Sequence, residues 1–261
     1  MRPVRRRTTH AEGLRFCGRG PALQGRFGYL PRPPNVINRM PAWIGWGAGL
    51  LAWNAGLINA VGLMGFSHEA ISHISGVTTQ TGLALSRGDL SIAAHLGAVI
   101  LAFFAGAVAS GAIIGDSTLR LGRRYGVALG VESALLFFAM LSLRNEGLYG
   151  QYLASAACGL QNALATTYSG AVVRTTHVTG VVTDLGIAIG RRLRGEEVPA
   201  NQPTLLAILF AGYLLGGVTG ALIYDRAGSA TLGIPAAVTA LLALSYSGFV
   251  KLRLPFLGGR G

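Results

Sequence analysis

The stretch His-Ile-Ser-Gly-Val-Thr-Thr-Gln-Thr-Gly-Leu-Ala-Leu-Ser-Arg, residues 73–87, occurs a second time as His-Val-Thr-Gly-Val-Val-Thr-Asp-Leu-Gly-Ile-Ala-Ile-Gly-Arg, residues 177–191. At a constant offset of 104 residues and without a gap, seven of the fifteen positions are identical. Four more positions exchange Ile, Val and Leu or Ser and Thr. We interpret the chain as an internal duplication organised around these two copies, the first and the second motif.

Each motif carries polar side chains seven residues apart, a spacing that places them on one stripe of a helix. We call the two stripes the polar seams. They consist of His73, Gln80 and Arg87 in the first motif and of His177, Asp184 and Arg191 in the second. The two seams differ in residue type at one position, where the first motif has the neutral amide Gln80 and the second has the acid Asp184. We expect this acid to lie near Arg191 or His73 and to couple to a cation or a proton.

The composition indicates that the bilayer is the main solvent of the chain. Of its 261 residues, 51% are hydrophobic and only 12% are charged, and the mean hydropathy is +0.49. These values are typical of a multi-spanning helical membrane protein and far from those of a soluble domain. The formal charge of +12 falls to +4 from Met40 onward, because nine Arg and one Glu precede that residue. We therefore expect membrane lipids, and not nucleic acid, as the surroundings.

Residues 1–39 are rich in Arg, Pro and Gly and lack the apolar core of a signal peptide. We expect a disordered basic tail, with Met40 as an alternative start of the protein.

Six apolar runs follow the tail, and each is long enough to cross a membrane as a helix. They cover about residues 43–66, 92–114, 125–143, 148–173, 205–224 and 230–250. The motifs fall between the first and second runs and between the fourth and fifth. If each motif also crossed the membrane, the chain would have eight spans. The distribution of basic residues distinguishes six spans from eight.

The positive-inside rule favours six spans with both termini in the cytoplasm. Ten basic residues after the tail then fall on the cytoplasmic side: Arg120, Arg123, Arg124, Arg174, Arg191, Arg192, Arg194, Lys251, Arg253 and Arg260. Three fall outside, namely Arg87, Arg144 and Arg226. With eight spans the split is eight against five, and the cluster around Arg123 is forced outside.

Three spans per copy is an odd number, so the second copy must start from the opposite face of the membrane. We predict an all-α membrane protein of six transmembrane helices arranged as two inverted three-helix repeats, residues 40–147 and 148–261. Such repeats are a construction principle of secondary transporters. Each Gly- and Thr-rich motif suits a half-helix that dips into the membrane, where irregular backbone survives only if it is buried in protein or lines a cavity.

The chain resembles the YoaK-like family of bacterial multi-pass inner-membrane proteins of unknown function, domain of unknown function 1275. The likeness lies in Asn59-Ala60, in Ser75-Gly76 and residues 79–82, in Gly-Leu-Gln-Asn-Ala at 159–163, and in residues 176–180 and 183–185. Relatives often have Asp at the position of Asn59 and Asn at that of Val77. The resemblance implies a multi-pass protein of the bacterial inner membrane and supplies no substrate.

Enzyme signatures are absent from the sequence: nothing resembles Gly-x-Ser-x-Gly, His-Glu-x-x-His or a phosphate-binding loop. His68 and Glu69 are adjacent potential ligands without a third, so we expect no metal site and no cofactor. A membrane-embedded enzyme using Glu132, His73 or His177 is the least favoured reading.

We favour a small permease whose path runs between the two polar seams. A non-transporting module that binds lipid or partner proteins through the same seams is the alternative, and the sequence leaves homo-oligomerisation open. Glu132 lies inside an apolar run, where an ionised acid costs about 2.5 to 3.5 kcal/mol on insertion scales, so it should face a cavity, pair or be protonated. Besides the seams, the candidate path residues are Asn59, Ser75, Gly76, Thr79, Glu132, Gln161, Asn162, Thr179, Gly180 and Thr183.

Overall fold

The computed structural model describes residues 42–65, 71–115, 123–145, 147, 149–169 and 174–257, with side chains between Gly45 and Tyr246. Every regular element in these ranges is a helix. The helices are α1 (Ala42–Gly65), α2 (Ile74–Ser86), α3 (Leu90–Ile114), α4 (Arg123–Arg144), α5 (Tyr149–Ser169), α6 (Val178–Leu193), α7 (Asn201–Ala227), the 3-10 helix η3 (Gly228–Leu232) and α8 (Gly233–Leu257). The basic tail, residues 1–39, lies outside the described residues.

A long helix lies at each of the six apolar runs, and a shorter helix lies at each motif. The motif helices α2 and α6 have 13 and 16 residues. At 1.5 Å per residue they are about 20 and 24 Å long, which is less than the hydrocarbon thickness of about 30 Å. The helical structure predicted for both motifs is confirmed, and each of these helices is shorter than the hydrocarbon layer.

Four of the described stretches are long and apolar enough to cross a membrane: Gly45–Gly65, Leu90–Ile114, Arg123–Arg144 and Asn201–Tyr246. The last of them contains α7, η3 and most of α8. Helix α5 does not qualify, because it carries residues such as Gln151 and Gln161 in its interior. Both side chains are buried among other helices, so they contact protein and avoid the cost of exposing a polar group to lipid.

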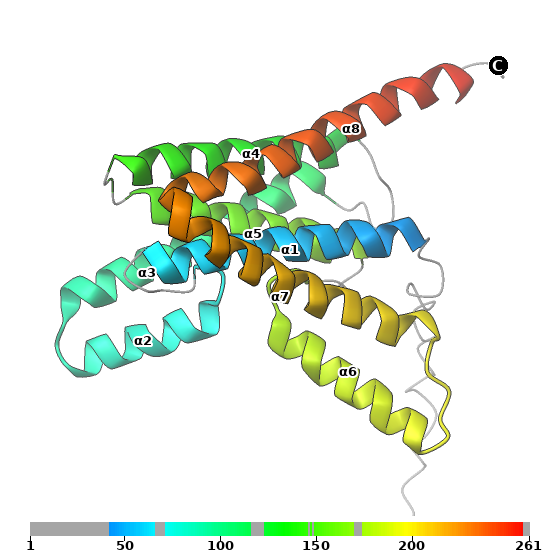
Figure 1. Ribbon diagram of the computed structural model, residues 1–261, viewed down its shortest axis with the longest axis horizontal. Coiled ribbons are helices and arrows are strands. Elements are labelled where there is room, and N and C mark those ends of the chain that lie inside the picture. The colour runs from blue at the N-terminus through cyan, green and yellow to red at the C-terminus, as the bar shows by residue number, and fades with distance from the viewer. Residues whose placement is uncertain are drawn as a thin grey trace, which may run out of the picture. The chain divides into compact units, whose positions relative to one another are not determined.

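Two close helix crossings join the halves, and each crossing pairs one long helix of the first half with one long helix of the second. At the first, α1 packs along α7 (Figure 1). A Cβ at Gly56 of α1 would overlap the carbonyl oxygen of Tyr213, and one at Gly216 of α7 would overlap that of Trp53. Glycine at both positions lets the two backbones touch, as small residues do at helix interfaces in membranes.

The second crossing, between α3 and α5, repeats this arrangement. A Cβ at Gly159 of α5 would overlap the carbonyl oxygen of Phe103, and one at Gly106 of α3 would overlap that of Ala156. The sequence Gly-Leu-x-Asn-Ala stands at both crossings, as residues 56–60 of α1 and 159–163 of α5. Each half therefore contributes its first long helix to a crossing with the second long helix of the other half.

Several of the remaining helix contacts are also matched between the halves. In Figure 1, α2 lies beside α3 and α6 beside α7, and α4 packs against its counterpart α8. Helix α4 also packs along α5, whereas the counterpart pair, α8 and α1, has far fewer contacts. The core between α1, α4 and α5 is built from fully buried side chains that include Leu57, Leu136 and Cys158.

Both motif helices end in the same turn, Arg-Gly followed by an acid. Gly88 and Gly195 adopt φ angles of +74° and +75°, a left-handed conformation that glycine adopts without strain. In each case the N–H of the acid that follows closes the turn: that of Asp89 donates to the Ala84 carbonyl, and that of Glu196 to the Arg191 carbonyl. The sequence thus fixes the point at which each motif helix stops.

Candidate functional site

The histidine that opens each motif has a local structural role. His73 and His177 are the N-terminal cap residues of α2 and α6, and each imidazole lies over the glycine three residues on. A Cβ at Gly76 or at Gly180 would collide with that ring. In the first motif, Nε2 of the imidazole also lies 3.1 Å from Oγ of Ser75. The repeated His-x-x-Gly pattern is therefore explained by packing within the motif.

The polar seams lie on the exposed side of their helices. Every seam residue is exposed, namely His73, Gln80, Arg87, His177, Asp184 and Arg191. The buried stripe of each motif is apolar and consists of Val77 and Ala84 in α2 and of Val181 and Ala188 in α6. The structure does not bring the two seams together, because α2 packs on α3 and α6 packs on α7 through these apolar stripes.

The motif hydroxyl groups bond within their own helices. Thr79 Oγ1 donates to the Ser75 carbonyl at 3.0 Å, and Thr183 Oγ1 donates to the Thr179 carbonyl at 2.8 Å. These are the back-bonds that Thr commonly makes to the preceding turn. Both threonine side chains remain exposed.

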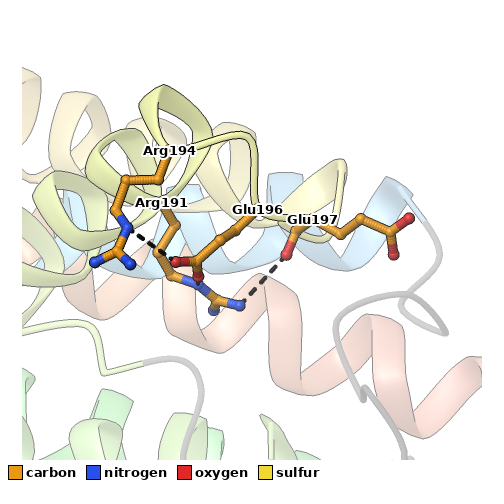
Figure 2. Close-up of polar contacts among 4 residues, drawn as sticks. All are labelled: Arg191, Arg194, Glu196 and Glu197. Carbon is orange, nitrogen blue, oxygen red and sulfur yellow. Dashed lines mark hydrogen bonds and ion pairs between the residues drawn. The ribbon is translucent and has the colours of Figure 1, made fainter.

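Arg191 is engaged by acids that follow its helix and not by Asp184. Its Nε donates to Oε2 of Glu196 at 3.0 Å, and its Nη2 donates to the Glu197 carbonyl at 3.4 Å (Figure 2). Glu196 also pairs with Arg194 at 3.3 Å. The expected proximity of Asp184 to Arg191 or His73 is therefore not seen. The Asp184 side chain is exposed on α6, and Arg191, in the last turn of α6, contacts the loop that follows this helix.

A polar cluster lies in the apolar interior between α1, α4 and α5. Glu132 of α4 is fully buried, and neither carboxyl oxygen has a hydrogen-bond partner. Its carboxyl group faces the side-chain amide of Asn54 on α1 without reaching hydrogen-bond geometry, and both polar atoms of that fully buried amide are otherwise unpaired. Cys158 of α5 lies within electrostatic range of the carboxyl group.

Gln161 ties α5 to α1 beside this cluster. Its Nε2 donates to the Leu51 carbonyl at 2.6 Å, while its Oε1 is buried and has no partner. Leu51 precedes Asn54 by three residues, and Cys158 precedes Gln161 by three, so each pair lies on one helical face. We call Glu132, Asn54, Gln161 and Cys158 the interior cluster.

A second polar group joins the start of the first motif to the long helices. The N–H and the hydroxyl of Ser72 both donate to Oδ1 of Asn59, at 3.3 and 3.0 Å, and the Tyr213 hydroxyl lies near both side chains. In the second half, the Thr176 N–H donates to Asn162 Oδ1 at 3.5 Å. Phe103 occupies the position equivalent to Tyr213 at the other crossing, so that half lacks the phenolic hydroxyl.

The structure thus divides the residues predicted from sequence into two sets. Asn59, Glu132 and Gln161 are buried, and Asn162 is half-buried, whereas the motif residues lie at the periphery. Asn54, Ser72, Cys158 and Tyr213 were missed as site residues. The signal for Asn54 was present, since an amide in an apolar run calls for a polar partner. Nothing in the sequence placed it opposite Glu132.

No group of three or more His, Cys, Asp or Glu side chains that could hold a metal ion occurs among the described residues. His68 and Glu69 lie outside them.

Comparison with known proteins places the chain in a family. A family model described as "Protein of unknown function (DUF1275)" matches residues 47–245. The chain is also 30% identical over 214 residues to the UPF0700 transmembrane protein RA0705 of Rhizobium meliloti (strain 1021), a match that covers 82% of this chain and 91% of the relative. No solved structure matches the chain. The family match extends over most of the chain and agrees with its apolar helices, so this protein belongs to the DUF1275 family and is a membrane protein.

Proposed function

We propose that the chain is a small permease of the bacterial plasma membrane, built from six transmembrane helices in two inverted halves with both termini in the cytoplasm. The matched helix crossings support two equivalent halves. The arginines at the start of α4 and at the end of α6 support the orientation, because basic residues gather on the cytoplasmic side. Helix α5 then crosses the membrane in spite of its polar residues, since it is enclosed by α3, α4 and α1.

The observation that carries this proposal is the buried, unpaired carboxyl group of Glu132. Ionisable residues inside membrane segments are costly, and they typically mark ion pathways, proton relays or substrate sites. In addition, Asn54 and Gln161 each keep unpaired polar atoms in the same interior. A structural role alone does not account for five unpaired polar atoms on three side chains of three helices, because buried polar atoms normally find partners.

The path therefore runs through the interior cluster and not between the polar seams. The motif helices α2 and α6 then cover the outer and the cytoplasmic side of the two crossings. A solute or ion that enters past either motif would meet Glu132, Asn54 and Gln161 where the halves join. This location agrees with the general placement of binding sites at the interface between repeats.

The test is flux through the purified, full-length protein in sealed vesicles. Solute uptake and collapse of an imposed pH gradient are measured for the wild type and for Glu132→Gln, which keeps the shape of the side chain and removes its charge. Asp225→Asn, which removes an exposed acid of α7, is the matched control. We expect Glu132→Gln to abolish flux and Asp225→Asn to retain it. Equal flux in wild type, Glu132→Gln and protein-free vesicles contradicts the proposal.

A second function is favoured by the outer faces of the motif helices. Apolar side chains are exposed there together with the seams: Leu83, Leu85, Val182, Ile187 and Ile189. A non-transporting module that holds lipid, a partner protein or a second copy of the chain would use these faces. Native mass spectrometry that detects a tightly bound lipid or a dimer, with no flux in vesicles, would favour this second function.

A further inference from the structure

We propose that the interior cluster is a proton-binding site in which Glu132 carries the proton and Asn54 is its hydrogen-bond partner. The inference rests on the proposed function, since it makes H⁺ the coupling ion of the permease. It assigns a ligand to the polar atoms of Glu132 and Asn54 that are left unpaired in the interior.

Among the residues whose side chains the structure describes, no Lys or Arg of the helices packed around Glu132 lies close enough to balance a carboxylate. On α4 the closest basic residues are Arg124 and Arg144, about 12 and 18 Å away along the helix axis. Helices α1 and α5 contain no Lys or Arg, and neither do the residues of α8 whose side chains are described. A permanently ionised carboxylate would therefore stay uncompensated in an apolar core, which is costly.

The other titratable groups on the described parts of the helices packed around α4 are a cysteine, a few tyrosines and one histidine. Cys158 of α5 lies near the carboxyl group. Tyr125 of α4 lies seven residues before Glu132, packed edge-on against Tyr168 of α5 and near Tyr246 of α8. On α3, Nδ1 of His95 lies 2.8 Å from the Tyr152 hydroxyl. A proton on Glu132 itself is the simplest way to neutralise the site.

A divalent metal cation fits this chemistry poorly. Ca²⁺ takes about six to eight oxygen ligands, and Mg²⁺ requires near-octahedral oxygen coordination. The interior cluster offers only one carboxyl group and the amide oxygens of Asn54 and Gln161. Its other surroundings are apolar, including the fully buried Leu57 and Leu136. A proton, in contrast, requires one acceptor.

Asn54 suits both protonation states of its partner. An asparagine amide has an oxygen that accepts and a nitrogen that donates hydrogen bonds. Its Oδ1 can accept from the protonated carboxyl group, and its Nδ2 can donate to the carboxylate after the proton has left. Release breaks the O–H bond on Glu132 and transfers the proton to a water molecule, which becomes H₃O⁺, and uptake reverses this step. The amide provides a hydrogen-bond partner for Glu132 in either state.

Infrared spectroscopy of the full-length protein in lipid vesicles tests this assignment, because a protonated carboxyl group has its own C=O stretching band. We expect the band at neutral pH in the wild type, its loss in Glu132→Gln and a shift of its frequency in Asn54→Leu. Glu132→Asp should keep a shifted band, which covers the case that Glu132→Gln fails to fold. Asp225→Asn should leave the band unchanged, and so should addition of Na⁺ or K⁺ at constant pH.

The assignment is overturned if folded Glu132→Gln and wild type have the same carboxyl bands, or if Na⁺ at constant pH abolishes the band. This readout does not depend on transport. A Glu132 band without flux in vesicles would support the proton site and contradict the permease. Flux without the band would support the permease and contradict H⁺ as the ligand of Glu132.

Discussion

Substitution of Gly106 by Ala tests the crossing of α3 and α5 on which the interior cluster depends. The added methyl group would overlap the carbonyl oxygen of Ala156. The obstacle is backbone and cannot rotate away, so the two helices must separate. Helix separation at this point also affects Gly159, which packs against the Phe103 carbonyl at the same crossing.

The cost follows from two opposing effects. Overpacking a well-packed interior typically costs about 1 to 3 kcal/mol, and a backbone obstacle favours the upper end. Replacing glycine by alanine inside a helix contributes about 1 kcal/mol in the other direction. We therefore expect Gly106→Ala to lower the free energy of unfolding by about 2 kcal/mol, which is roughly a 30-fold change in the folding equilibrium.

Gly111→Ala is the matched control in the same helix. No atom lies within 4 Å of a Cβ built at Gly111, so this variant gains the helical preference of alanine without a clash. Unfolding of the purified proteins in mild detergent is followed by circular dichroism. We expect Gly111→Ala to be at least as stable as the wild type. If Gly106→Ala is as stable as Gly111→Ala, α3 and α5 do not cross with touching backbones and the reasoning is wrong.

Three further predictions concern other parts of the molecule. Tyr213→Phe removes the hydroxyl near Ser72 and Asn59, and it should cost no more than about 1 kcal/mol in the same unfolding assay, the contribution of a typical hydrogen bond. Asp184→Asn should change stability by less than about 0.5 kcal/mol and leave flux intact, since the side chain is exposed; loss of flux at normal protein level would place this acid back in the path. In intact cells, a cysteine at Asn145 should react with an impermeant reagent added outside and one at Arg194 should not; the reverse pattern would contradict the proposed orientation.

Local sequence determined the helices. The apolar runs, the seven-residue spacing of the motifs and the glycines at 88 and 195 act within a few residues of chain, so periodicity and turn chemistry are sufficient to place them. The family also followed from short motifs read along the chain. Local reasoning was weakest at α5, whose run falls short of a span by hydropathy. Its polar residues Gln151 and Gln161 are buried among other helices, a circumstance that no local pattern reveals.

Only the tertiary structure decided which stripe of each motif is buried. Val77 and Ala84 have the same seven-residue spacing as the polar seam, so periodicity allowed either stripe to face inward, and packing on α3 selected the apolar one. The sequence also did not determine which long helices of the two halves pack together, since glycines that allow close helix contact do so with many partner helices. The placement of Asn54 opposite Glu132 depends on that packing, because the two residues lie on helices that are far apart in the sequence and meet only when the core between α1, α4 and α5 is assembled.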